Sequence, residues 1–288
     1  LIPSGALAYR PNQKLTVGMG MAGLSGMGVD FDDITPFPGN QNVVTTKQFY
    51  KIAPGFGYRI NEQWTWGAAL NIDYQSLAVD TPTLHLPQNQ AYGFGASIGA
   101  TYQPMDKLRF GVSYISKQEM DEFEWNATDG KFKLEMDAPE QLAVGAAFTP
   151  NEDLLIEADI KWIGYSDVLD SVDLERDGTV ATTFNYGWDD QVVYALGVQK
   201  KLNPKTTVRA GLNYGESPIG PEDVKDNIGS LAVTEEHLSL GLTRELAKRL
   251  SASFSYVRAF NNEITSEDGT TTIELEQNVF NLQISYRN

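Results

Sequence analysis

The segment from Trp64 to Gln75 reads WTWGAALNIDYQ. Its even-numbered positions hold Trp, Trp, Ala, Leu, Ile and Tyr, and its odd-numbered positions hold Thr, Gly, Ala, Asn, Asp and Gln. Side chains of a β-strand alternate between two faces, so this period of two predicts a strand with one apolar face. That face has aromatic residues at both ends and aliphatic residues between them, which is typical of a strand that crosses a lipid bilayer between two aromatic girdles.

The same alternation recurs along the chain, and we count about thirteen such segments. They include Leu15–Met21, Tyr92–Tyr102, Leu108–Tyr114, Leu142–Phe148, Leu154–Trp162, Val192–Val198, Val208–Tyr214, Leu238–Leu242, Leu250–Tyr256 and Phe280–Tyr286. The residues on the opposite face are mostly Gly, Ala, Ser and Thr with scattered charges, which suits the lining of a barrel lumen. A soluble β-sandwich or a lipocalin-like barrel also alternates, but the small opposite face and the number of strands favour a membrane barrel.

The connections between the predicted strands fall into two classes. Short ones lie at residues 11–13, 61–63, 104–107, 150–153, 203–205 and 247–249, and the others are longer and carry most of the acidic residues. Short turns on one side and long loops on the other are the topology of bacterial outer-membrane barrels. The predicted fold class is therefore all-β, a transmembrane antiparallel barrel with about 13 strands visible of 14, in a single domain spanning residues 1–288.

Composition excludes several other classes of protein. The 288 residues carry a net charge of -16 and no cysteine, and no apolar run approaches the length of a membrane-spanning helix. The acidic balance argues against nucleic-acid binding, and the lack of cysteine excludes disulfides and thiolate metal sites. The acidic residues Asp30, Asp32 and Asp33 lack the spacing of a calcium loop, so we expect neither a metal site nor a cofactor.

One motif of an enzyme is present but lies in the wrong context. Gly95-Ala96-Ser97-Ile98-Gly99 matches the nucleophile-elbow pattern of hydrolases, which requires a turn between a strand and a helix. Here the motif lies in the middle of a predicted strand, and the only histidines, His85 and His237, lie in or beside loops. We therefore predict that the chain is not an enzyme.

Several segments together resemble the FadL family of outer-membrane transporters for long-chain fatty acids and aromatic hydrocarbons. They are residues 8–18 (AYRPNQKLTVG), residues 92–114, Trp188-Asp189-Asp190, and Arg209-Ala210-Gly211 followed by Glu216-Ser217-Pro218-Ile219. The resemblance implies fourteen strands, an amino-terminal hatch that plugs the lumen, and a kinked third strand that opens the wall sideways. The Asn-Pro-Ala motif of the hatch does not occur here, so we expect Leu1 to follow the hatch and the first strand.

The inward-facing charges are candidate contacts for the polar head of a ligand. By the period-two rule Lys51, Asp73, Lys117, Glu157, Asp159, Lys161 and Arg209 point into the lumen, where such charges also commonly pair across strands. Many members of the resembled family have a basic residue where Ile115 stands, and Lys117 could substitute for it. We predict that Lys117 or Arg209 meets a carboxylate, and that the loop residues Phe123, Trp125 and Phe132 help to form an apolar capture groove.

The glycines of one segment are candidates for a lateral opening. Gly18, Gly20, Gly23, Gly26 and Gly28 fall within eleven residues, and the apolar alternation fails after Met21. Glycine weakens a strand and marks bulges and bends, although it also relieves crowding or begins a loop. In the resemblance this strand forms the lateral opening, so we predict an opening in the wall beside Gly23, Leu24, Ser25 and Gly26.

The predicted function is passive uptake of hydrophobic compounds, such as long-chain fatty acids, across a bacterial outer membrane. Its expected partners are the hydrophobic ligand, the surrounding lipid and lipopolysaccharide, with no nucleic acid, and the barrel is expected to be monomeric. The alternative is a structural or interaction protein, an adhesin or a scaffold subunit, that uses the acidic loops. Lipid that co-purifies with the protein would favour uptake, whereas a protein partner bound through the loops would favour the alternative.

Overall fold

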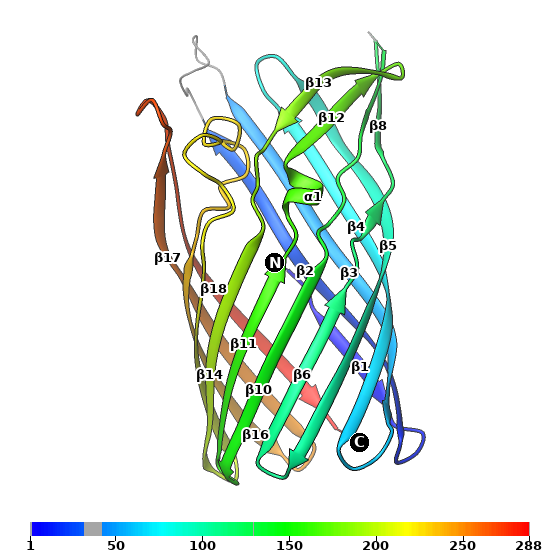
Figure 1. Cartoon of the computed structure of the whole chain (residues 1–288), viewed down its shortest axis with the longest axis vertical. Helices are drawn as coiled ribbons and strands as arrows, with labels where there is room; N and C mark the ends of the chain where they lie inside the picture. Colours follow the sequence, from blue (N-terminus) through cyan, green and yellow to red (C-terminus); the bar gives the residue numbers. More distant parts are fainter. Residues whose placement is uncertain (1, 32–41, 129, 288) are drawn as a thin grey trace.

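The computed structural model describes residues 2–31, 42–128 and 130–287. These residues form a tall tube of tilted strands with a cap of loops and short strands at one end (Figure 1). The tube strands are β1 (Gly5–Tyr9), β2 (Leu15–Phe31), β3 (Val43–Arg59), β4 (Trp64–Asp80), β5 (His85–Met105), β6 (Leu108–Ile115), β10 (Gln141–Asn151), β11 (Leu154–Ile163), β14 (Gln191–Asn203), β15 (Thr206–Gly215), β16 (Glu236–Ala247), β17 (Leu250–Thr265) and β18 (Thr272–Tyr286).

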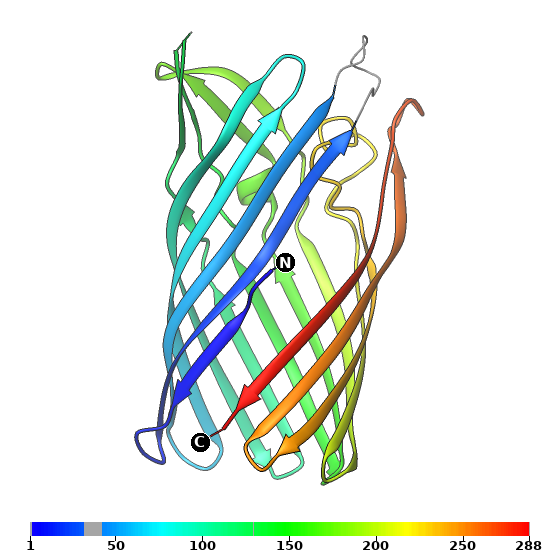
Figure 2. The same cartoon turned by 180° about the vertical axis from the view of Figure 1, so that it is seen from behind.

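Among the described residues these strands belong to one antiparallel sheet of 14 strands. The short β7 (Glu119–Met120) lies off the main path and pairs with β5, and the remaining thirteen follow one another as chain neighbours in the sheet. The predicted fold class, an antiparallel barrel with about thirteen visible strands, is confirmed. β1 and β18 are the two ends of the strand order (Figure 2), and whether a further strand joins them stays a prediction.

Asparagine side chains close four of the short turns, which explains why these turns are so tight. The Oδ1 atom of Asn12 accepts hydrogen bonds from the backbone of Lys14 and Leu15, both at 2.9 Å. Asn61, Asn151 and Asn203 accept a backbone N–H two residues later at 2.9, 3.0 and 3.0 Å in the same manner. Asparagine favours such turns because its short side chain replaces a backbone acceptor. The short connections predicted from the sequence all lie at the end of the barrel opposite the cap (Figure 1).

The outer face of the barrel has two girdles of aromatic rings. Tyr74 lies 6.3 Å from Tyr50 and 5.5 Å from Tyr92, measured between ring centroids, while the Trp64 ring stacks on that of Tyr102 at 4.5 Å. Trp64 and Tyr74 are ten residues apart on β4, which corresponds to about 25 Å across the membrane at a strand tilt of about 40°. This height matches the apolar band of an outer-membrane barrel, about 25 Å.

The interior of the molecule is packed at the loop end and not at the centre of the tube. A four-stranded sheet of β8 (Phe123–Ala127), β9 (Gly130–Leu134), β12 (Ser171–Arg176) and β13 (Thr179–Asn185) caps this end, in the order β13-β12-β9-β8. The short helix α1 (Ser166–Leu169) precedes β12. Phe123, Leu174, Val224 and Val233 are at most 1% exposed in this cap. The sequence pattern indicates acidic loops in these segments and does not predict their sheet.

No helix within the described residues is long and apolar enough to cross a membrane.

Candidate functional site

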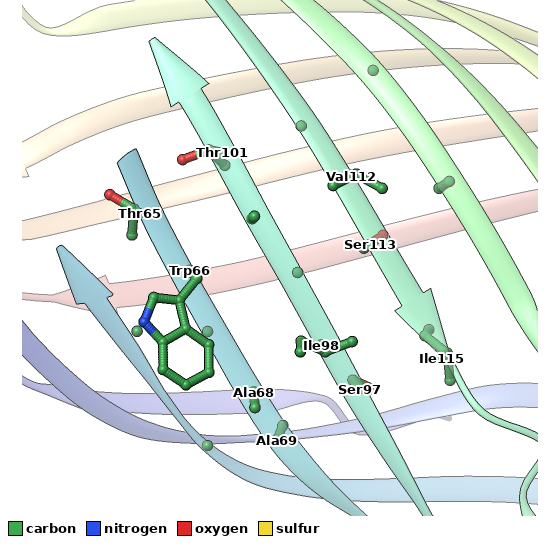
Figure 3. A pocket seen from close by; sticks show the side chains of 18 of the residues that line it. Thr65, Trp66, Ala68, Ala69, Ser97, Ile98, Thr101, Val112, Ser113 and Ile115 are labelled. Carbon is green, nitrogen blue, oxygen red and sulfur yellow. The ribbon is translucent and has the colours of Figure 1, made fainter. Parts of the chain in front are cut away.

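The half of the lumen near the short turns is wide and lined by small side chains. A cavity of about 900 Å³ lies there against β1–β6, β10 and β11. Figure 3 shows how Ser97 and Ser113 on neighbouring strands alternate with Ile98 and Val112. Charge is sparse in this cavity, where Arg109, Glu157 and Asp159 are the charged lining residues. We call it the lower cavity.

A segment of the chain lies inside the barrel on the loop side of the lower cavity. Residues 135–140, which we call the strap, join β9 to β10. Ala138 of the strap and Gln118 form two backbone hydrogen bonds with each other, of 2.9 and 3.1 Å. The side chain of Gln75 on β4 donates a hydrogen bond of 3.0 Å to the carbonyl oxygen of Met136. Gln75 faces the lumen, so this bond holds the strap inside the barrel against the wall.

A row of polar side chains lies on the inner face of β4, and one of them, Gln75, is bonded to the strap. Asn71 and Asp73 are fully buried and Gln75 is 1% exposed. Asn71 exchanges hydrogen bonds with the hydroxyl of Ser97, and the Nζ of Lys51 lies 3.9 Å from Asp73 Oδ1. Both carboxylate oxygens of Asp73 lack a hydrogen-bond donor among the described residues, so within this row the bond from Gln75 to Met136 is the contact that holds the strap.

Two further cavities lie between the strap and the cap. One, the wall cavity, has a volume of about 310 Å³ and is bounded by the strap residues Asp137, Ala138 and Pro139 and by Leu24 and Ser25 of β2. The other, the outer cavity, has a volume of about 270 Å³ and lies under the cap. The two cavities share the lining residues Met27, Lys47, Leu169 and Trp188. They are therefore adjacent compartments of one space.

The outer cavity is bordered by apolar and aromatic side chains. Leu77, Leu86 and Phe184 line it, together with Tyr186, which lies between β13 and β14. Burial raises the pKa of Tyr186 to about 12, because the phenolate would lose its hydration there. Such an environment favours an apolar occupant.

Among the described residues, the wall cavity shares no lining residue with the lower cavity or with the cavity of about 760 Å³ beside β14–β16. The strap residues Asp137, Ala138 and Pro139 line the wall cavity, and no residue of the strap lines the other two cavities. A molecule in the wall cavity thus meets the strap below it and β2 beside it.

The structure explains why the alternation of β2 fails after Met21. The ladder between β2 and β3 shifts by one residue between Gly23 and Ser25, so Leu24 is the extra residue of a β-bulge. Leu24 is 52% exposed and also lines the wall cavity, so it lies at the boundary between the outer surface of the barrel and this cavity.

The two edges of β2 differ at this level. The ladder with β3 continues through Gly23 to Gly28, apart from the bulge. On the other edge the last pair within the described residues is Gly5 with Met21. The continuous ladder disfavours an opening between β2 and β3. The predicted lateral opening therefore stays a prediction, and it concerns the edge of β2 that faces β1.

The structure places the two predicted basic residues in different surroundings. The Nζ of Lys117 forms an ion pair of 2.7 Å with Oδ2 of Asp137 and so helps to hold the strap. Arg209 on β15 donates hydrogen bonds of 2.7 Å to the side chains of Gln199 and Thr243 on the neighbouring strands. Neither residue borders the wall cavity or the outer cavity, and their contact with a ligand stays a prediction.

The predicted aromatic residues lie in the packed core of the cap. Phe123 is fully buried and stacks on Trp125 at 5.7 Å, and the indole of Trp125 donates a hydrogen bond to the carbonyl oxygen of Pro87. Phe132 packs against the same core. None of the three lines the wall cavity or the outer cavity, where Phe184, Tyr186 and Trp188 lie instead. A role of the three predicted aromatic residues in capture stays a prediction.

Lys47, which is not among the residues predicted from the sequence, lines both the wall cavity and the outer cavity. Its position on β3 differs from that of Lys51 by four, so the period-two rule places both on the inner face. Lys51 has Asp73 as its ionic partner, whereas the described residues provide no hydrogen bond or ion pair for Lys47. Lys225 also lines the outer cavity but pairs with Asp268, so among the described residues Lys47 is the lysine of these cavities that has no ionic partner.

Comparison with known proteins agrees with this architecture. Outer membrane protein P1 of Haemophilus influenzae is 24% identical over 228 residues, which cover 72% of this chain and 50% of that protein. The chain thus spans about half the length of the curated relatives that it matches.

Solved structures share the fold at low sequence identity. A FadL homologue of Pseudomonas aeruginosa superposes with a TM-score of 0.80 and 16% identity, covering 99% of this chain and 78% of that chain. The toluene transporter TbuX of Ralstonia pickettii superposes with a TM-score of 0.79 and 18% identity, covering 99% and 81%. The family described as outer membrane protein transport protein (OMPP1/FadL/TodX) matches residues 1–287. The chain therefore belongs to this family of outer-membrane transport proteins, whose members are channels and not enzymes.

Proposed function

We propose that this protein lets hydrophobic compounds, such as long-chain fatty acids, enter the outer membrane by passive uptake. The compound is captured at the loop end, passes through the outer cavity into the wall cavity, and leaves sideways through the barrel wall. The family and the toluene transporters among its structural neighbours support transport of hydrophobic molecules. Its partners in this proposal are the ligand, the surrounding lipid and lipopolysaccharide, and the barrel acts as a monomer.

The direction of exit follows from the solvents on either side of the wall. A hydrophobic chain gains about 0.8 kcal/mol for each methylene that moves from water into an apolar environment. The lower cavity leads toward an aqueous compartment and is lined mainly by glycine, alanine, serine and threonine. An acyl chain therefore gains free energy by entering the bilayer and gains none by descending through the lower cavity.

The observation that carries the proposal is the position of the wall cavity. It is bounded below by the strap and at the side by Leu24 and Ser25, at the bulge of β2. Backbone groups inside a bilayer must be paired, so a strand that is bulged and rich in glycine is where a wall opens at the smallest cost. The wall cavity thus offers a path that avoids the lower half of the lumen.

Uptake of a labelled long-chain fatty acid by cells that depend on this protein tests the route. Ser25→Arg places a long charged side chain at the wall cavity and should abolish uptake. Ser113→Arg places the same side chain in the lower cavity, on the inner face of β6, and should leave uptake close to that of the parent.

Both variants must reach the outer membrane in a folded, heat-modifiable form for the comparison to hold. If Ser113→Arg blocks uptake and Ser25→Arg does not, the compound descends through the lumen and the lateral route is wrong.

A further inference from the structure

We propose that the wall cavity selects hydrophobic molecules that end in a hydroxyl group, such as long-chain alcohols or alkylphenols, over hydrocarbons and over ionised fatty acids. This inference rests on the proposed function and names the head group that the site prefers. Its basis is a pair of side chains, Lys47 and Gln75, that line the wall cavity with opposite hydrogen-bonding capacity.

Lys47 and Gln75 are diagonal neighbours on the inner face of the barrel. Lys47 on β3 is in register with Leu77 on β4, and Gln75 on β4 is in register with Phe49 on β3. The two residues are thus displaced by one inward position across neighbouring strands. Long side chains at such diagonal positions are within reach of one another and of a shared small molecule.

Gln75, which lines the cavity, has an acceptor without a donor. Its Nε2 atom donates to the carbonyl oxygen of Met136, and because a carbonyl can only accept, the amide cannot be turned the other way. Its Oε1 atom is buried and has no hydrogen-bond partner among the described residues. A buried amide oxygen without a donor is unfavourable, so a ligand that supplies a donor is stabilised there.

In its protonated form Lys47 presents only donors, because an ammonium group has three N–H bonds and no lone pair. The described part of the chain gives it no carboxylate partner. Asp137 lines the same cavity but is already engaged, since Oδ2 pairs with Lys117 at 2.7 Å and Oδ1 accepts the backbone N–H of Met120 at 2.8 Å. The cation therefore remains available to an acceptor on a ligand.

A hydroxyl group satisfies both side chains at once. Its oxygen accepts from Lys47 and its hydrogen is donated to Gln75. An ionised carboxylate has acceptors only, so it pairs with Lys47 but sets a negative oxygen against Gln75 Oε1. A hydrocarbon leaves both groups unpaired.

The remaining lining suits the rest of such a molecule. Leu24, Phe49, Leu169 and Trp188 provide apolar contacts for a chain or a ring. The remaining polar residues that line the cavity can each donate and accept, and they are Ser25, Gln141, Tyr165, Gln191 and Thr234. They can therefore accompany any head group, and the discrimination falls to Lys47 and Gln75.

Binding of a matched twelve-carbon series tests the inference. Dodecane, 1-dodecanol and dodecanoate at pH 7 are equilibrated with the purified full chain in amphipol, and bound ligand is quantified by mass spectrometry. The parent should bind 1-dodecanol about tenfold more tightly than dodecane, as expected for a hydrogen bond to a charged group, and more tightly than dodecanoate.

Two variants assign the preference to the pair. Lys47→Met should reduce the affinity for 1-dodecanol about tenfold while that for dodecane changes less than twofold. Gln75→Leu, which also removes the bond to the strap, should abolish the preference for 1-dodecanol over dodecane. Lys161→Met, which removes a lysine of β11 that borders neither cavity, should leave all three affinities unchanged. Heat-modifiable migration confirms that each variant is folded.

The outcomes separate this inference from the proposed function. If the parent binds dodecane or dodecanoate at least as tightly as 1-dodecanol, or if both variants keep the preference for the alcohol, the inference is wrong while uptake of hydrophobic compounds stands. If the parent binds none of the three probes, both the inference and the proposed function are wrong.

Discussion

Replacement of Leu196 by arginine tests which face of the barrel meets lipid. Leu196 lies near the middle of β14, is 57% exposed, and is in register with Ala158 and Leu212 on the neighbouring strands. Tyr194 and Val198 flank it on the same face. An arginine near the bilayer midplane of a barrel costs about 2–4 kcal/mol, so Leu196→Arg should destabilise the folded protein by that amount.

A matched control lies on the same strand. Leu202 is 56% exposed, has the same parity as Leu196, and is close to the short turn after Asn203. Arginine near the interface costs about 0–1 kcal/mol, so Leu202→Arg should be nearly neutral. The expected difference is about 2–3 kcal/mol, or roughly a 30- to 150-fold change in the unfolding equilibrium.

The assay is reversible folding into lipid vesicles along a urea gradient, followed by tryptophan fluorescence, with parent and both variants in the same lipid. Equal stability of Leu196→Arg and the parent would show that Leu196 does not face lipid. Equal destabilisation by both variants would contradict the depth assigned to the two positions. Leu240 and Ile98, at 46% and 53% exposure, carry the same expectation as Leu196.

Three further predictions concern the interior and the cap. Gly93→Ala should lower the free energy of unfolding by about 1–3 kcal/mol, because the added Cβ would lie 2.5 Å from the backbone of β7. Gly111→Ala, whose added Cβ meets nothing within 4 Å, should be tolerated. Equal urea midpoints for the two variants would refute this prediction. The raised pKa of Tyr186, about 12 against about 10 when unfolded, stabilises the fold fully below pH 10, and this contribution is lost as the pH rises toward 12. An ultraviolet titration should therefore show a late phenolate step that Tyr186→Phe removes, and a titration curve unchanged by that substitution would contradict it. Uptake of a fatty acid is expected to fall in the Lys117→Ala, Arg209→Ala double variant if these residues contact the head group, and normal uptake with normal folding would leave them as ordinary lumenal charges.

Much of the barrel could be predicted from the sequence because its strands are local in pattern. Each strand alternates large apolar and small residues, and each short turn carries a turn-forming residue such as Asn61 or Asn203. These features need no knowledge of distant contacts. They predicted the fold class, the outer face and the positions of the short turns.

The cap sheet was missed for the opposite reason. β8, β9, β12 and β13 have five to seven residues each, and β9 pairs with β12 some forty residues along the chain. Apolar residues such as Phe123 and Trp125 therefore resembled exposed capture residues, although the structure buries them in the cap core. A short strand that forms by long-range pairing leaves little periodic signal.

The candidate site was only partly predictable for a related reason. The glycine-rich segment around Leu24 was visible in the sequence, and the structure gives it a β-bulge beside the wall cavity. The strap was not predictable, since its position depends on the contacts of Gln75 and Gln118 with residues far along the chain. The period-two rule applied to Lys47 as well as to Lys51, but only the structure shows that Lys51 has an ionic partner and that Lys47 lines the cavities.

Photochemical mapping of the route tests the central claim most directly. A long-chain fatty acid with a terminal diazirine is added to the protein in outer-membrane vesicles, irradiated, and its adducts are located by mass spectrometry of the peptides. The lateral route predicts adducts on the residues of the outer and wall cavities and on Leu24 and Ser25, with none on Ser97, Ser113 or Ile115 of the lower cavity. Adducts on those three residues, with none at Leu24 or Ser25, would contradict it.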